Sequence, residues 1–287
     1  MSGSIDYTQL FQNIGTSSSD ATTNLLNIIY GNGTQATGNT DPLPALQQAE
    51  ANQTQDIAQT AQQPQVARDI AAFQAAVASA KTPADLLSNP AALKVILTAN
   101  GLGDQVGNDA LAQQALLSDP SQSDSLANQL STTNSAWLST ANLYDFATKG
   151  LSVISSPQVQ STIANAYAEV TWRQSLDATT PGLSNALTFL SEGSTITSVD
   201  QILGDPILRT VFTTALNIPA QIAFQPLEAQ ERAISSAVDI TRFQDPSFVQ
   251  SFAQQYLLAE QAANSSSSSS STTDLSTLAV RAQGLVV

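Results

Sequence analysis

The sequence contains no cysteine and no histidine, and these two absences exclude several kinds of functional site. Without cysteine there is no disulfide, no thiolate nucleophile and no sulfur ligand for zinc or an iron–sulfur cluster. Without histidine there is no Ser–His or Cys–His catalytic pair, and no imidazole to bind a metal or transfer protons near neutral pH. The sequence therefore predicts no catalytic residues, no cofactor and no metal site. An enzyme would have to work with carboxylates alone, in a cluster deep within a pocket.

Charge is also scarce, and what there is has mostly one sign. Charged residues make up 11% of the chain, with 9 Lys and Arg against 23 Asp and Glu, which gives a net charge of −14. Ser, Thr, Asn and Gln fill the difference at roughly four residues in ten, where charged residues alone usually reach about 25%. Such a surface repels phosphate and anionic lipid, so nucleic acid is not a predicted partner. Acidic proteins are often simply soluble, and that reading stays open.

Long apolar runs are missing as well. No stretch approaches the roughly 18 apolar residues that a transmembrane helix requires, so no membrane insertion is predicted. The first residues, Met1–Tyr7, lack the basic region and the apolar run of a secretory signal peptide. If the protein is exported, we expect a route that does not use a cleaved signal.

What the sequence does contain is helical periodicity, and it predicts an all-α fold. From Val66 onward, apolar residues such as Ile70, Phe73 and Val77 recur at spacings of three and four, which is typical of amphipathic helices. Patterns typical of strands are scarce.

Helix starts are marked by polar residues that stand directly before proline. A polar side chain at the N-cap accepts a backbone N–H, and proline suits the first helical position. The predicted caps are Thr82, Asn89, Asp119, Asp205 and Asp245. The alternative makes the three aspartates a carboxylate cluster for metal binding or acid–base chemistry. Because a capping carboxylate is already engaged with backbone N–H groups, we favour the structural role.

Two segments of the chain resemble each other. A shift of 116 residues places Phe73 on Phe189 and the pair Asn89-Pro90 on Asp205-Pro206. Ten additional residues then enter the second segment between Ile218 and Phe243, after which the shift is 126. In that second frame Asp119-Pro120-Ser121 meets Asp245-Pro246-Ser247. Because caps, prolines and apolar positions match together, we predict one helical domain built from two related halves by internal duplication.

Composition divides the chain into four predicted regions. Residues 1–50 hold a run rich in Gly, Thr, Asn and Pro, and we expect them to be loosely ordered. Residues 51–155 and 156–262 are the two predicted helical halves. Residues 263–287 combine the serine tract of residues 265–271, a flexible linker by composition, with an apolar C-terminal tail. That tail either folds back on its own domain or docks on another subunit.

Several short motifs are similar to those of one bacterial family. They include Val66-Ala67-Arg68-Asp69-Ile70, Thr82-Pro83-Ala84-Asp85-Leu86-Leu87 and Asp119-Pro120-Ser121. Together they resemble the domain-of-unknown-function family twelve-seventeen, over residues 65–150 and more faintly to about 258. Where this family commonly has an acid before the first proline, the chain has Asn89. The family has no established reaction, and the resemblance brings no catalytic residue.

The resemblance implies a setting. Genes of this family tend to lie among flagellar genes of alphaproteobacteria, and proteins that pass unfolded through the flagellar channel tend to lack cysteine and to be rich in small polar residues. We therefore expect a non-enzymatic structural or accessory protein of the flagellum. It would be secreted by the flagellar type III route and would bind other flagellar subunits or copies of itself as a homo-oligomer. The alternative is a cytoplasmic helical binding module, such as an export chaperone or a flagellar regulator.

Overall fold

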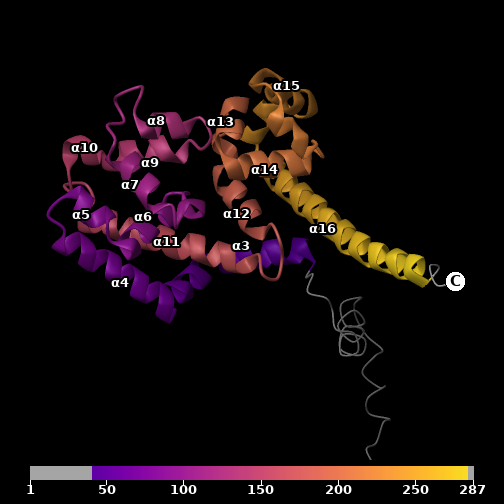
Figure 1. Cartoon of the computed structure of the whole chain (residues 1–287), viewed down its shortest axis with the longest axis horizontal. Helices are drawn as coiled ribbons and strands as arrows, with labels where there is room; N and C mark the ends of the chain where they lie inside the picture. Colours follow the sequence, from indigo (N-terminus) through magenta and orange to yellow (C-terminus); the bar gives the residue numbers. More distant parts are fainter. Residues whose placement is uncertain (1–40, 284–287) are drawn as a thin grey trace, which may run out of the picture. The chain divides into compact units, whose positions relative to one another are not determined.

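A computed structural model describes residues 41–283, without the side chains of residue 220 and of residues 266–283. Throughout this range the chain forms helices and turns and no strand, so the predicted all-α class is confirmed (Figure 1). None of the helices in residues 41–283 is both long and apolar enough to span a membrane.

The helices of the N-terminal part are short apart from the first two and the last. In chain order they are α3 (Pro42–Ala61), α4 (Pro64–Ser79), α5 (Pro83–Leu87), α6 (Pro90–Ala99), the 3-10 turn η1 (Gly103–Gln105), α7 (Asp109–Leu117), α8 (Leu126–Ser131), α9 (Ala136–Tyr144), α10 (Phe146–Lys149) and α11 (Pro157–Leu176).

The C-terminal part continues with a similar alternation of helices and 3-10 turns. These are α12 (Leu183–Glu192), η2 (Gly193–Thr195), α13 (Val199–Gly204), α14 (Pro206–Ala215), η3 (Ala220–Phe224), α15 (Leu227–Ala237), η4 (Ile240–Gln244) and α16 (Pro246–Gln283).

The first hydrophobic core is built around α6. This helix packs against both α4 and α11, and Leu93, Ile96 and Leu97 are at most 1% exposed. A helix covered on two sides has to be apolar over most of its circumference, and the sequence of α6 is apolar at all but three positions. Phe73 of α4 and Leu86 of α5 complete the centre of this core with no exposed surface.

One buried polar cluster lies within the first core and joins three helices. Asp69 of α4 accepts hydrogen bonds from Lys94 Nζ of α6 at 2.7 Å and from the hydroxyl of Tyr167 of α11 at 2.6 Å. Gln65 Nε2 donates a third at 2.8 Å. Burial by itself raises the pKa of the Asp69 carboxyl, but these hydrogen bonds outweigh it and hold the pKa below its usual value.

The second core is a cluster of aromatic rings. The rings of Phe189, Phe212, Phe243 and Phe252 contact one another from α12, α14, η4 and α16, with centroids 4.9–5.9 Å apart. These edge and tilted contacts are the arrangements that aromatic rings prefer. The four side chains are at most 2% exposed, so this cluster is the centre of the C-terminal part.

Helix α11 belongs to both cores, which corrects the predicted boundary between the halves at residues 155 and 156. Its Ile163 and Tyr167 lie in the first core, and its Trp172 lies in the second. A 20-residue helix is about 30 Å long, enough to reach across two small cores. The cores therefore share an element instead of meeting at a linker.

Helix α3 corrects the prediction that residues 1–50 are loosely ordered, as far as residues 41–50 are concerned. Asp41 caps this helix through a hydrogen bond from the N–H of Leu43, and Pro42 takes the first helical position. Leu46 is fully buried in the second core and Ala49 is 5% exposed, so tertiary packing outweighs the weak local helix signal. Residues 1–40 lie outside the described range.

The serine tract of residues 265–271, predicted as a flexible linker, lies within α16, which runs to Gln283. Serine costs only about half a kcal/mol per residue relative to alanine in a helix, and the helix is started by packed residues such as Phe252 and Tyr256. The hydroxyl of Ser265 donates to the carbonyl of Gln261 at 2.8 Å, which keeps this polar group within the helix.

Several local structures recur in the frame of the predicted repeat. Capping boxes begin both α5 and α13. Beyond the next helix of each half, the N–H of Leu102 donates to the carbonyl of Leu97, and the N–H of Ile218 donates to that of Thr213, both at 2.8 Å. These matches are local, and the internal duplication itself stays a prediction.

Candidate functional site

Four of the five predicted capping residues stand at helix starts, and Thr82, Asn89 and Asp205 are the first three of them. Thr82 Oγ1 accepts the N–H of Asp85, whose carboxylate in turn accepts the N–H of Thr82. Asn89 accepts two backbone N–H groups at the start of α6, and Asp205 accepts two at the start of α14, all at 2.8–3.1 Å. These side chains satisfy helix N–H groups that would otherwise have no partner.

The prediction for Asp119 is wrong, because no helix begins after it. Its carboxylate accepts the N–H and the hydroxyl of Ser121 and closes a turn, and α8 starts only at Leu126 with Ser125 as its cap. The equivalent bonds of Ser247 to Asp245 stand directly before α16. After Asp245 the apolar residues Phe248 and Val249 can pack on the core and hold the first turn of α16 in place. After Ser121 the chain continues with polar residues, so a first helical turn there would have no apolar side chain to pack.

The three aspartates therefore lie at three separate turns or helix starts, each bound to its own backbone. Within residues 41–283, no group of three acids is placed so that it could hold a metal ion. A more promising surface lies between Ile218 and Phe243, where the predicted repeat has its ten additional residues.

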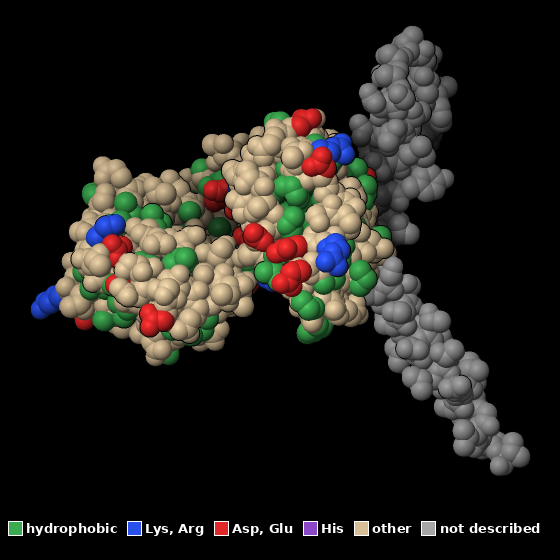
Figure 2. Space-filling view, turned by 90° about the horizontal axis from the view of Figure 1, so that it is seen from above, with side chains coloured by type: hydrophobic (Ala, Val, Ile, Leu, Met, Phe, Trp, Pro, Cys, Tyr) green, Lys and Arg blue, Asp and Glu red, His purple; other side chains and the backbone are tan. Residues whose placement is uncertain are grey.

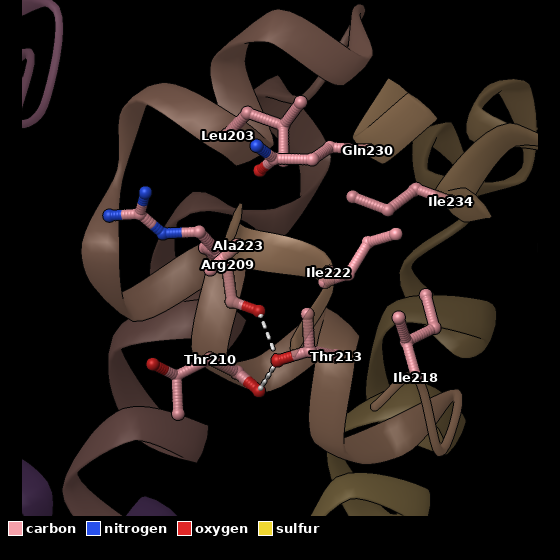
Figure 3. Close-up of a pocket in the computed structure, with 9 residues that line it drawn as sticks. All are labelled: Leu203, Arg209, Thr210, Thr213, Ile218, Ile222, Ala223, Gln230 and Ile234. Carbon is pink, nitrogen blue, oxygen red and sulfur yellow. Dashed lines mark hydrogen bonds between the residues drawn. The ribbon is translucent and has the colours of Figure 1, made fainter. Parts of the chain in front are cut away.

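A hollow of about 210 Å³ lies between α14, η3 and α15. Its walls come from α13 and α14 on one side and from the segment between Ile218 and Ile234 on the other (Figure 3). The lining is mainly aliphatic and consists of Leu203, Arg209, Thr210, Thr213, Ile218, Ile222, Ala223, Gln230 and Ile234. A recess of this kind accepts an apolar side chain of a partner.

In the frame of the predicted repeat, two differences in sequence coincide with the hollow. In the repeat frame Arg209 and Thr213 stand where α6 has Leu93 and Leu97, which are buried in the first core. Thr213 Oγ1 donates to the carbonyl of Arg209 at 2.8 Å. Its hydroxyl is thus satisfied on α14, and its methyl group points into the hollow, while the Arg209 guanidinium points away (Figure 3). The wall is therefore more apolar than its sequence indicates.

Exposed apolar side chains stand beside the hollow. Phe224 follows the lining residues Ile222 and Ala223 directly and is 88% exposed, and Leu227 at the start of α15 is 54% exposed. A phenylalanine side chain left this exposed forgoes burial worth about 1.5–3 kcal/mol. Together with the hollow, these two residues form what we call the α14–α15 surface.

The rim of the α14–α15 surface is acidic. Glu228 and Glu231 lie on α15, and Asp200 lies on α13, which packs against α15. Partial desolvation, together with the carboxylates of Asp200 and Glu228, raises the pKa of Glu231. Seen from the α15 side, acidic, basic and hydrophobic side chains lie next to one another over this half (Figure 2). Arg209 on α14 and Arg232 on α15 offset two of the three carboxylates, so the local balance remains acidic by one charge.

The sequence indicated ten additional residues between Ile218 and Phe243, but it did not indicate that this segment forms an exposed apolar surface. The available signal was Phe224 and Leu227 on either side of Pro226, because two large apolar residues around a proline suggest an apolar turn. Whether such residues are buried depends on what packs over them, which the local sequence does not state.

Comparison with protein families decides where the chain belongs. Residues 99–249, which run from the end of α6 to the start of α16, match the family described as Protein of unknown function (DUF1217). The chain belongs to this family. The match begins later and ends earlier than the resemblance over residues 65–150 and on to 258 had indicated. It includes the α14–α15 surface, so this surface lies within the part that defines the DUF1217 family.

A solved structure with a similar fold supports the architecture. The X-ray structure of protein AGR_C_984 from Agrobacterium tumefaciens is similar with a TM-score of 0.66 and 23% sequence identity, over 80% of this chain and 98% of that chain. At this identity the likeness shows the fold alone. No curated protein matches the chain.

Proposed function

We propose that this protein acts by protein–protein assembly, as a structural or accessory component of the bacterial flagellum that is exported through the flagellar type III route. The observation that carries the assembly role is the α14–α15 surface, with Phe224 88% exposed beside a hollow lined by aliphatic side chains. Aromatic anchors next to apolar recesses supply much of the free energy of protein interfaces. An exposed apolar group rimmed by polar residues is typical of such contacts.

The flagellar setting is supported by the family resemblance and by composition. The chain lacks cysteine and has few charged residues, features that we associate with passage through a narrow channel in the unfolded state. Short helices with caps drawn from their own first turns are likewise compatible with folding after transport.

The experiment follows the protein in strains with and without the flagellar export gate. We expect it in the culture medium and in purified flagella of the gate-proficient strain, and only in cells of the other. Phe224→Ser should be exported equally well but should be reduced in the assembled fraction, because its side chain is exposed and its loss leaves the fold intact. Immunoblots of cells, medium and purified flagella measure all three.

Leu143→Ser is the matched control for the assembly arm, because Leu143 is also 54% exposed, like Leu227, but lies on α9. A cytosolic enzyme followed on the same blots controls for lysis. Equal release from both strains contradicts export. Retention in the cytosol together with copurification of one flagellar subunit favours the alternative, a cytoplasmic chaperone or regulator that uses the same surface.

A further inference from the structure

We propose that the α14–α15 surface receives the apolar segment Leu275–Val287 of a second copy of this chain, so that copies join through two unlike surfaces. The inference rests on the proposed function and deepens it by naming the partner. It is drawn from the shape of the hollow, the sequence of the segment, the course of α16 and the charges on both sides.

The hollow has the form and chemistry that an aliphatic anchor requires. Leu203, Ile218, Ile222 and Ile234 line a space of about 210 Å³, which is of the size that one or two leucine side chains fill. Phe224 directly follows the lining residues Ile222 and Ala223 in the chain and is exposed. A partner segment that places a leucine in the hollow therefore has an exposed aromatic ring within the same short segment to bind.

The segment carries apolar residues at the spacing that such a surface can bind. Within α16, Leu275, Leu278 and Ala282 follow one another at i, i+3 and i+7, and beyond Gln283 the sequence continues with the apolar residues Leu285, Val286 and Val287. This spacing is typical of one face of a helix. Amphipathic helices bind apolar grooves through residues spaced in this way. Val280 does not belong to this series.

The course of α16 favours a second copy over the chain's own hollow. Among the side chains described up to residue 265, Leu257 is the last that is buried, and the helix continues to Gln283. Leu275 stands 18 residues further along, which is about 27 Å of helix. Figure 1 shows α16 leading away from α12 and α14. To reach its own hollow the segment would have to break the helix, whereas a second copy can bind it as it stands.

The charges of the two surfaces are complementary. Arg281 is the one charged residue in Leu275–Val287, and the rim of the hollow carries Asp200, Glu228 and Glu231. Arg209 and Arg232 on the same surface offset two of these carboxylates. Arg281 therefore meets a local excess of one negative charge, which orients the contact against the general repulsion between two copies of net charge −14.

Sedimentation velocity of the full chain over a range of concentrations tests the proposal. We expect association that grows with concentration. Leu278→Ser on the segment and Phe224→Ser at the hollow should each raise the dissociation constant about ten- to hundredfold, as expected for removing one large apolar anchor. Val280→Ser and Leu143→Ser are the matched controls and should leave it unchanged.

Mixing the two weakened variants gives the sharper result. Phe224→Ser keeps an intact segment and Leu278→Ser keeps an intact hollow, so an equimolar mixture should form one-to-one pairs that grow no further. Unlike surfaces predict this rescue, whereas a symmetric contact predicts that both variants fail in the mixture as well. Rescue also shows that both variants are folded.

The proposal is overturned if the wild-type chain is monomeric at all concentrations, as a fold-back of the segment predicts, or if Leu278→Ser associates as tightly as the wild type. It is also overturned if the mixture shows no rescue. The proposed function is tested separately. A monomeric protein from which Phe224→Ser still removes flagellar assembly has another partner, and a self-associating protein that stays in cells without regard to the export gate has another setting.

Discussion

At the scale of single residues, the Asp69 side chain connects three helices of the first core. It accepts hydrogen bonds from residues of its own helix and of two others. Its side chain is 11% exposed, while that of its ionic partner Lys94 is 40% exposed. Water around Lys94 screens the ion pair, so we assign most of the stabilisation to the hydrogen bonds that keep the buried carboxylate satisfied.

Asp69→Asn should lower the free energy of unfolding by about 1–3 kcal/mol near neutral pH, because a buried acceptor of charged and hydroxyl donors is lost. The pKa of Asp69 lies below its usual value in the folded protein. Its contribution is therefore complete above the unfolded value of 3.8 and is lost as the pH falls through the folded pKa. Urea unfolding followed from pH 7 into acid should show a difference from wild type that is largest near neutral pH and becomes smaller below about pH 3.8.

Asp104→Asn in η1 provides the control, because Asp104 is an exposed aspartate of the same half. It should change the free energy of unfolding little throughout this pH range. A difference between Asp69→Asn and wild type that persists undiminished in acid would contradict the role of the carboxylate charge.

At the residue scale, the polar–proline pairs predicted most helix starts correctly and one of them wrongly. Asn89-Pro90, Asp205-Pro206 and Asp245-Pro246 precede helices, whereas Asp119-Pro120 precedes a turn. The same polar–proline pair permits both outcomes, since the carboxylate can cap a helix or close a turn on the next serine. What decides is the apolar residue three or four positions later, which a cap motif by itself does not contain.

At the scale of elements, the approach of α12 to α16 depends on a glycine. Gly182, at the N-cap of α12, has φ +84°. A Cβ atom at this position would lie 2.8 Å from the hydroxyl of Tyr256 and 2.9 Å from Glu260 Cγ, both on α16. The turn into α12 therefore needs glycine both for its backbone conformation and for its closeness to α16.

Gly182→Ala should destabilise the protein by about 1–3 kcal/mol, from the left-handed backbone together with the contact to α16. Gly101→Ala isolates the first of these, because Gly101 has φ +76° and the added Cβ would meet only Ala136 Cβ, at an ordinary 3.8 Å. Its cost should be about 1–2 kcal/mol. Chemical unfolding of both variants measures the difference, and equal losses would show that the α12–α16 contact adapts without cost.

The sequence predicted whether a helix forms, but not which other parts of the chain pack against it. The helical spacing around Phe73 predicted α4, whereas α3 was underestimated because few of its side chains are large and apolar. Its place is set by Leu46, which is buried in a core whose members outside α3 lie more than 120 residues further along the chain. Phe224 shows the converse case. Phenylalanine is usually buried, but Phe224 is exposed, and the local sequence does not show which of the two to expect.

At the scale of the whole molecule, the two cores are coupled through shared helices. α11 contributes to both, and Ile57 of α3 packs against both. Disrupting either core would therefore expose apolar surface of the other. We expect the described part of the chain to unfold as one cooperative unit in spite of its two cores.

The two tryptophans report on this coupling separately. Trp137 lies in the first core at 2% exposure and Trp172 lies in the second at 3%. Trp172→Phe leaves only the first reporter and Trp137→Phe only the second. Within each variant, the urea midpoint from tryptophan fluorescence should coincide with the midpoint from far-ultraviolet circular dichroism. Separate midpoints would mean that one core melts before the other.

The position of the caps has a consequence for how the chain regains its structure. Thr82, Asn89 and Asp205 each find their hydrogen-bond partners two or three residues away. Contacts of such small sequence separation form early and quickly, because little chain entropy is lost in closing them. A molecule that leaves a ribosome or a narrow pore end first can therefore begin its helices as they emerge. We expect the slow step to be the packing of α3 against α12 and α16, because α16 has to emerge before this contact can form.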